Sequence, residues 1–209
     1  MHGAKHRTGK GFGGDRVARD QARLLEALRA QGLLLVQDRS LPSVVTLVLG
    51  ETLSTSWWSH PRGREVFRCL DLLADHPDVL TTKLVLGKVT FVHRNLWPAL
   101  LAVATAREPW QFRRLSKPAR TLYERVQRVG ETTASGTPAK ALERRLLVHS
   151  EQAHTETGHH ETRLESWEHW LARTGYQLDA GRLTAAQGRE QLEAAARRIG
   201  GSGSELPWE

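Results

Sequence analysis

Apolar residues recur at helical spacing in several separate stretches of this chain. They predict helices from Asp15 to Ala30, in a short run after Pro42, from Arg62 to Ala74, and in a stretch that Asn95 caps. The first two of these patterns end at Gly32 and Gly50, where a glycine can terminate a helix. The apolar run from Leu33 to Val36 is too short to be assigned.

Two further stretches have the pattern of β-hairpins. Val79–Leu86 and Val89–His93 flank the turn residues Gly87-Lys88, and the stretch from Leu146 to His160 has its expected turn at Thr155–Gly158. Each hairpin follows a short predicted helix, and this order is typical of a winged helix-turn-helix. The sequence therefore predicts a mainly α fold with small β-hairpins (α+β), arranged as tandem winged helix-turn-helix lobes.

The remaining helices complete this division. Ser116 caps a helix that Gly130 ends, Thr137-Pro138 starts the helix before the second hairpin, and Thr184-x-x-Gln187 starts the last helix. Thr162-x-x-Glu165 has the form of a capping box for a helix through Trp167 and Trp170. We expect a flexible basic tail (1–14), a first lobe (15–93), a connecting helix (94–112), a second lobe (113–166), C-terminal helices (167–199) and a loose tail (200–209).

The net charge of +7 is distributed unevenly along the chain. Residues 111–150 contain nine basic and three acidic side chains, whereas residues 151–209 contain six basic and ten acidic ones. A basic stripe of this kind attracts phosphate backbones through counterion release. The sequence therefore predicts double-stranded DNA as the partner, and no uncharged run is long enough to indicate a membrane partner. The single Cys69, expected to be buried, suits a reducing cytoplasm, and DNA binding suggests association with the nucleoid.

The candidate DNA contacts are basic and histidine side chains on the predicted helices and hairpins. They are Arg62, Arg64, Lys83 and Lys88 in the first lobe, and Arg113, Arg114, Lys117, Arg120, Lys140, Arg144, Arg145, His154 and His159 in the second. Two alternatives stay open for the arginines. They could pair with the acidic C-terminal segment, or form a basic surface with no specific partner.

The pair Trp57-Trp58 lies on a polar connector, where two adjacent indoles are not expected to face the same core. One function for Trp57 and Trp58 is to stack on an unpaired or extruded base, and the alternative is that both anchor the loop.

His149, His154, His159 and His160 alternate with acidic residues, which raises the question of a metal site. The spacing lacks the i, i+4 helical pair, and no cysteine accompanies it, so we expect no metal here. The motifs that bind nucleotides, dinucleotides or other cofactors are also missing from the sequence, and we expect no cofactor.

The tandem winged-helix order resembles that of bacterial proteins related to the AlkZ-type winged-helix DNA glycosylases. Leu115-Ser116-x-x-Ala119-x-x-Leu122, Leu142–Val148 and His154-Thr155-Glu156-Thr157-Gly158-His159 carry the resemblance, which covers about residues 33–170. That family excises damaged bases with a Gln-x-Gln or Gln-x-Asp motif. The nearby match is Gln37-Asp38-Arg39, where Arg39 stands at the second catalytic position, so the motif is not intact.

The resemblance implies catalytic roles for Gln37 and Asp38. Gln37 would position a water molecule, and Asp38 would act as its base or stabilise positive charge on the sugar. The expected function is binding of double-stranded DNA at damaged or distorted sites. The alternatives are a dimeric transcriptional regulator and a protein-interaction module, and the oligomeric state is left open.

Overall fold

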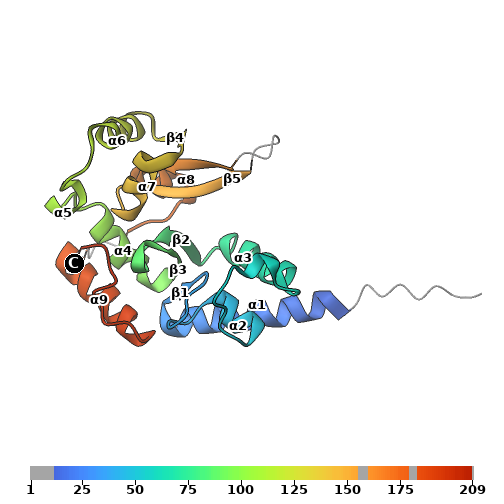
Figure 1. The fold of residues 1–209 in the computed structure, drawn as a ribbon. Helices are drawn as coiled ribbons and strands as arrows, with labels where there is room; N and C mark the ends of the chain where they lie inside the picture. Colours follow the sequence, from blue (N-terminus) through green and yellow to red (C-terminus); the bar gives the residue numbers. More distant parts are fainter. Residues whose placement is uncertain (1–11, 155–159, 179–182, 209) are drawn as a thin grey trace, which may run out of the picture.

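The computed structural model describes residues 12–154, 160–178 and 183–208, which form two lobes joined along one side (Figure 1). The first lobe contains α1 (Phe12–Gln31), β1 (Leu33–Leu35), α2 (Val44–Leu49), α3 (Gly63–Ala74), β2 (Val79–Lys83) and β3 (Val89–His93). The second contains α5 (Pro109–Phe112), α6 (Lys117–Val129), β4 (Glu131–Ala134), α7 (Gly136–Arg144), β5 (His149–His154), β6 (His160–Glu165) and α8 (Trp167–Thr174). Short 3-10 turns occupy Trp57–Ser59, Val85–Gly87 and Arg94–Leu96.

Each lobe contains one three-stranded antiparallel sheet, and the two sheets have the same pattern of strand order. The first sheet has the order β1-β3-β2 and the second β4-β6-β5, so the last strand of each lobe lies in the middle. These sheets and the surrounding helices confirm the predicted α+β class. The predicted hairpins are also present, with Leu80 opposite Val92 in the first and Ser150 opposite Leu164 in the second.

Two helices form the junction between the lobes. α4 (Trp97–Ala104) and α9 (Ala185–Arg198) lie against each other, as seen at the edge of the molecule in Figure 1. A Cβ at Gly188 would lie 2.6 Å from the carbonyl oxygen of Ala99, so the glycine permits this close approach. Trp167 and Trp170 of α8 join the same core, which links both lobes.

The run Leu33–Leu35, left unassigned by the sequence, is strand β1. All three side chains are buried, with Leu34 in the core of the first lobe and Leu33 and Leu35 in the junction core. Both faces of the first sheet are therefore covered, and this explains why the strand has a continuous apolar pattern rather than an alternating one.

Two predictions about local structure are wrong, and the two lobes differ in their number of helices. Thr162-x-x-Glu165 is not a capping box, because both residues lie in β6, and Ser166 caps α8 by accepting a hydrogen bond from the His169 N–H. Leu86 is not part of a strand, since β2 ends at Lys83 and a turn follows it. The second lobe has a single helix, α7, between β4 and β5, where the first has two helices between β1 and β2.

The C-terminal residues 200–208 do not form the loose tail that the sequence predicts. Leu206 is buried in the junction core, and Trp208 Nε1 donates to Glu193 Oε1 at 2.9 Å. An apolar residue so close to the end of the chain reaches the core because Gly200 and Gly203, both at positive φ, turn the backbone after α9. The basic tail predicted at residues 1–14 lies mostly outside the described residues.

Among the described residues, no helix is both long enough and apolar enough to cross a membrane.

Candidate nucleic-acid interface

Nine basic side chains lie between Arg113 and Arg145, on and beside helices α6 and α7 of the second lobe. We call this set the basic surface, and it consists of Arg113, Arg114, Lys117, Arg120, Arg125, Arg128, Lys140, Arg144 and Arg145. All are exposed except Arg145, which is half-buried. None of the nine forms an ion pair with a carboxylate within the described part of the chain.

Helix α6 is built so that its cations point to solvent. Ser116 accepts a hydrogen bond from the Ala119 N–H at its start, and Gly130 ends the helix at a φ of 84°. Ala119 and Val126 face the core of the second lobe. With 3.6 residues per turn, the opposite face carries Lys117, Arg120, Arg125 and Arg128.

Helix α7 continues the basic surface toward the first lobe. Lys140 and Arg144 are four residues apart and therefore share one face of the helix. The Arg145 side chain donates to the carbonyl oxygen of Arg113 at 3.1 Å. A Cβ at Gly87 would lie 3.5 Å from Arg144 Nε, which places the tip of the first hairpin directly against this helix.

The acidic C-terminal segment does not neutralise the basic surface. Glu165 and Glu151 pair with Arg173, and Glu193 pairs with Arg197. Glu205 accepts hydrogen bonds from the backbone N–H groups of Ser202 and Gly203, which lower its pKa. Within the described residues, the alternative that these acids pair with the arginines of residues 113–145 is therefore not observed.

The four candidate cations of the first lobe have different surroundings. Lys83 forms an ion pair with the buried Glu143 of α7, across the two lobes. Lys88 forms an ion pair with Asp38, and Arg62 with Glu65. Arg64 is exposed on α3, and no partner for it is found among the described residues. Of these four cations, Arg64 is thus the most available to an external phosphate.

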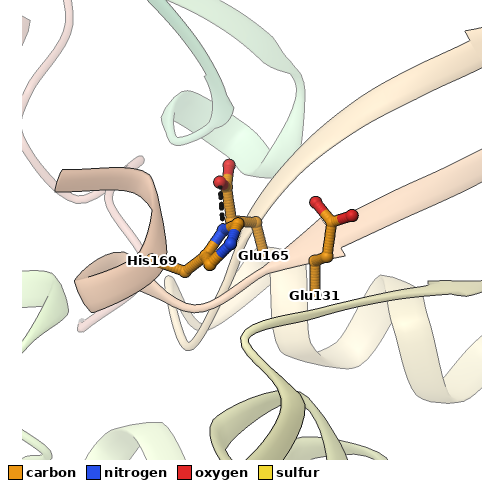
Figure 2. A group of neighbouring side chains, drawn as sticks. All are labelled: Glu131, Glu165 and His169. Carbon is orange, nitrogen blue, oxygen red and sulfur yellow. Dashed lines mark hydrogen bonds and ion pairs between the residues drawn. The ribbon is translucent and has the colours of Figure 1, made fainter. Parts of the chain in front are cut away.

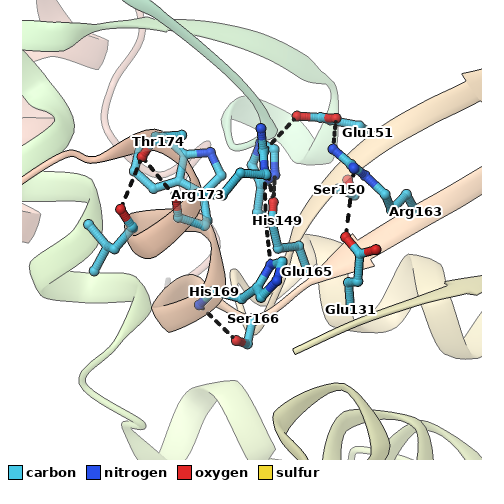
Figure 3. Close-up of polar contacts among 12 residues, drawn as sticks. Glu131, His149, Ser150, Glu151, Arg163, Glu165, Ser166, His169, Arg173 and Thr174 are labelled. Atoms are coloured by element: carbon cyan, nitrogen blue, oxygen red, sulfur yellow. Dashed lines mark hydrogen bonds and ion pairs between the residues drawn. The ribbon is translucent and has the colours of Figure 1, made fainter. Parts of the chain in front are cut away.

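Buried Glu165 lies at the centre of a charged network in the second lobe (Figure 3). Arg173 donates to both of its carboxylate oxygens, at 2.8 and 2.9 Å, and His169 Nδ1 lies 2.7 Å from Oε1 (Figure 2). His149 Nδ1 lies 3.4 Å from Oε2, within ion-pair distance but without hydrogen-bond geometry. Burial alone would raise the pKa of Glu165, but Arg173 and the two imidazoles outweigh it and hold that pKa well below its usual range.

The same network contains two groups of potential metal ligands. Glu131, Glu165 and His169 form one group, and His149, Glu151 and Glu165 form the other, with the donor atoms of each group within 4.8 Å of one another. Arg173 binds both Glu151 and Glu165, and Arg163 binds both Glu151 and Glu131. These guanidinium groups already supply the positive charge that the carboxylates require, so the network is built as an ion-pair cluster that attaches α8 to the second sheet.

A cleft of about 860 Å³ separates the first sheet from the second lobe. Its charged lining includes Lys83, Glu143, Glu151 and Arg173, all engaged in ion pairs. Ser150 Oγ also donates to Glu143 Oε1 at 2.8 Å. The ion pair between Lys83 and Glu143 joins the lobes across this cleft, whereas Asp71 and Asp75, also in its lining, are exposed and form no ion pair among the described residues.

Gln37 and Asp38, the candidate catalytic residues, line a second pocket of about 700 Å³. Gln37 Nε2 donates to the carbonyl oxygen of Thr55 at 2.8 Å. Asp38 Oδ1 accepts the backbone N–H groups of Ser40 and Leu41, and Oδ2 lies 2.6 Å from Lys88 Nζ. Burial would raise the pKa of Asp38, but Lys88 and the two N–H groups lower it to about 2. Both side chains support the local fold, and their catalytic roles stay predictions.

Replacing Asp38 with asparagine is expected to lower the free energy of unfolding at neutral pH by about 2 kcal/mol. The pKa falls from its ordinary 3.8 to about 2 on folding, so this stabilisation is present above pH 3.8 and is lost as the pH falls toward 2. Urea unfolding of both proteins at neutral pH and at about pH 2.5 would show the difference shrinking in acid. Asp75→Asn, at an exposed position, is the control. If the difference in unfolding free energy between Asp38→Asn and the unmodified protein were the same at both pH values, the ion pair of Asp38 with Lys88 would not be its source.

Trp57 and Trp58 differ in burial, as expected for two adjacent indoles that cannot face the same core. Trp57 is buried in the core of the first lobe with 6% of its surface exposed, whereas Trp58 is 65% exposed. The two rings stack with centroids 4.0 Å apart, and Phe67 of α3 lies 5.7 Å from Trp58. Burial leaves Trp57 no free ring face, so the prediction of base stacking applies to Trp58 alone.

The histidine cluster is only partly described. His149 is buried and opposes Glu165 across the sheet, and His154 opposes His160 in the register of the hairpin. His159 and the predicted hairpin turn lie outside the described residues, and the side chain of His154 is not described either. DNA contacts from these two histidines stay predictions.

Sequence reasoning missed Leu86 and Arg173. Leu86 is 51% exposed at the tip of the first hairpin, next to the basic surface. An apolar residue directly before the glycine of a hairpin turn was the available signal. Arg173 carried no such signal, because its partners Glu151 and Glu165 are known only from the fold.

In comparisons with protein-family models, curated proteins and solved structures, no match to this chain was found.

Proposed function

We propose that this protein binds double-stranded DNA through the basic surface. The observation that carries the proposal is that nine cations between Arg113 and Arg145 have no carboxylate partner within the described residues. Elsewhere in the second lobe and the junction, Arg107, Arg163, Arg173 and Arg189 all form ion pairs. Unpaired, exposed cations on adjacent helices are what a phosphate backbone requires, because each contact releases condensed counterions.

The arrangement of elements supports a winged-helix mode of binding. Each lobe has a helix, a strand, further helical structure and then a hairpin, and each sheet places its last strand in the middle. In our proposal the lobes are tandem winged helices, the second one short by a helix. Helix α7, which carries Lys140 and Arg144, takes the position of the helix that precedes the wing. Action on damaged or distorted nucleoid DNA is part of the same proposal.

The test is a variant that removes three charges from the basic surface: Arg113→Gln, Lys140→Gln and Arg144→Gln. All three side chains are exposed, and none forms an ion pair among the described residues, although Arg144 also lies against Gly87. If each contacts one phosphate, the slope of log affinity against log salt concentration should become shallower by about 3. Binding at moderate salt should weaken by about tenfold or more. Fluorescence anisotropy with a labelled duplex, over about 50–200 mM salt, measures both quantities.

The matched control removes three charges from the helices α1 and α9, by Arg29→Gln, Arg197→Gln and Arg198→Gln. Because both variants have the same net charge, a nonspecific charge effect would weaken binding equally in the two. We expect the control to bind almost as the unmodified protein does. Absence of binding by the unmodified protein at low salt, or equal losses in both variants, would refute the proposal.

A further inference from the structure

The tip of the first hairpin presents the apolar side chain of Leu86 to solvent. Leu84 and Val85 are buried, but Leu86, which follows them, is 51% exposed. Burial of an apolar side chain is normally favourable, at about 25 cal/mol per Å² of apolar surface. Leu86 therefore gains little from folding, and a partner that covers it would gain this stabilisation on binding.

The backbone at Leu86 is strained as well. Its φ of 55° and ψ of 21° lie in the left-handed region, which costs a residue with a Cβ about 1–2 kcal/mol. The Leu86 N–H donates to the carbonyl oxygen of Glu205 at 2.7 Å, and the Lys88 N–H donates to that of Val85 at 2.9 Å. The buried Leu206 fixes the C-terminal segment that supplies the first of these acceptors. The surrounding structure thus holds the backbone of the tip in this strained conformation, as is found at functional sites.

Cations surround this tip. Arg144 lies against Gly87, and Lys88 follows it in the chain. Arg145, next to Arg144 in the chain, donates to the carbonyl oxygen of Arg113, which ties the end of α7 to the start of the basic segment. A partner that covers Leu86 would therefore have an apolar interior and a negatively charged exterior, and duplex DNA combines stacked bases with phosphates in this way.

We propose that Leu86 is a wedge that inserts between stacked base pairs when the protein binds duplex DNA. The proposal rests on the proposed function and adds how that same interface distorts its ligand. Apolar side chains that enter a base step unstack it and kink the duplex, while nearby arginines and lysines hold the phosphates. A rigid tip is suited to this role, because a mobile side chain would lose entropy on insertion.

The pocket that contains Gln37 and Asp38 lies beside Leu86 and could receive a displaced base. Leu86 lies on the rim of the 700 Å³ pocket that contains Gln37, Asp38 and the hydroxyl groups of residues 54–56. This volume is within the range of pockets that hold small ligands, about 300–1,000 Å³. The pocket is the natural destination for a base that the wedge displaces, since amide and hydroxyl groups can hydrogen-bond its edges.

The test uses duplexes that contain 2-aminopurine, whose fluorescence rises when it loses its stacking neighbours. Saturating protein should raise the fluorescence by about threefold or more if the wedge unstacks a base step. Leu86→Gly removes the side chain and suits the left-handed backbone, and Leu86→Asn puts a polar group on a residue that also accepts this conformation. Both variants should lose most of the fluorescence increase while their affinity for the intact duplex changes by about threefold or less.

Val129→Ala is the control, because Val129 is equally exposed and lies at the end of α6. It should leave the fluorescence increase unchanged. If the unmodified protein binds the duplex without raising the 2-aminopurine fluorescence, the wedge proposal is wrong although DNA binding stands. The same holds if the Leu86 variants still raise the fluorescence as the unmodified protein does. A protein that binds no duplex at low salt would overturn the proposed function and the wedge together.

Discussion

Replacing Glu165 with glutamine is expected to destabilise the protein by about 3–5 kcal/mol. The side chain is 1% exposed and is in contact with Arg173, His169 and His149. Loss of its charge leaves the Arg173 guanidinium without the partner that compensates its partial burial. The exposed Glu151 is the remaining acidic contact of Arg173, and it is shared with Arg163.

Urea unfolding of the Glu165→Gln protein at neutral pH measures this loss, and Glu168→Gln is a control three residues away. Glu168 is 61% exposed and 3.6 Å from an equally exposed Arg107, so its substitution should change stability by about 1 kcal/mol or less. Because folding lowers the pKa of Glu165, its stabilisation is present above the ordinary 4.5 and is lost as the pH falls below it. The urea unfolding curves of the unmodified protein and of Glu165→Gln should therefore approach each other in acid. Equal effects of the two substitutions would show that the network contributes no more than a surface pair.

The helices of this protein are largely readable from the sequence because their signals are local. Ser116 and Gly130 bound α6 within one residue, and Thr184 with Gln187 forms the predicted capping box of α9. In these elements the apolar spacing, the cap and the terminating glycine all lie within a few turns of one another. Burial of Cys69 was also predicted correctly from helical spacing, and burial raises the pKa of its thiol to about 11.

The short strands were not readable, since their stability comes from distant partners. β1 has three residues and pairs with β3 through Leu34 and Phe91, far apart in the chain. Strand β4 has four half-buried or exposed residues and is defined only by its pairing with β6. The Thr-x-x-Glu pattern at Thr162 illustrates the opposite error, because a local cap signature also fits a strand that precedes a helix.

The candidate site was predicted in composition but not in organisation. Counting charges identified the basic segment, yet it could not decide whether the C-terminal acids neutralise it. The fold answers this by pairing those acids with Arg163, Arg173 and Arg197. Lys83 shows the limit of such counting, since its partner Glu143 is 60 residues away and engages it in the cleft between the lobes.

Replacing Trp167 with alanine is expected to destabilise the protein by about 3–5 kcal/mol. Trp167 is 2% exposed in the junction core, and its indole Nε1 donates to the carbonyl oxygen of Leu146 at 2.7 Å. Alanine would leave both a cavity and a buried carbonyl without its donor. Leu146 has a φ of 52° in the turn after α7, so the bond from Trp167 also fixes the segment that carries Arg144 and Arg145.

Two further substitutions separate the contributions of volume and hydrogen bonding. Trp167→Phe keeps most of the ring but loses the N–H donor, and it should cost about 1–3 kcal/mol in urea unfolding. Trp58→Ala, at an exposed indole, should cost about 1 kcal/mol or less. If the bond to Leu146 positions the basic surface, Trp167→Phe should also weaken duplex binding under conditions where the protein stays folded, whereas Val129→Ala should not. A Trp167→Phe protein with normal DNA affinity would show that the hydrogen bond to Leu146 is not needed to position α7, which Lys83 through Glu143 and Gln111 through the Arg145 carbonyl also hold.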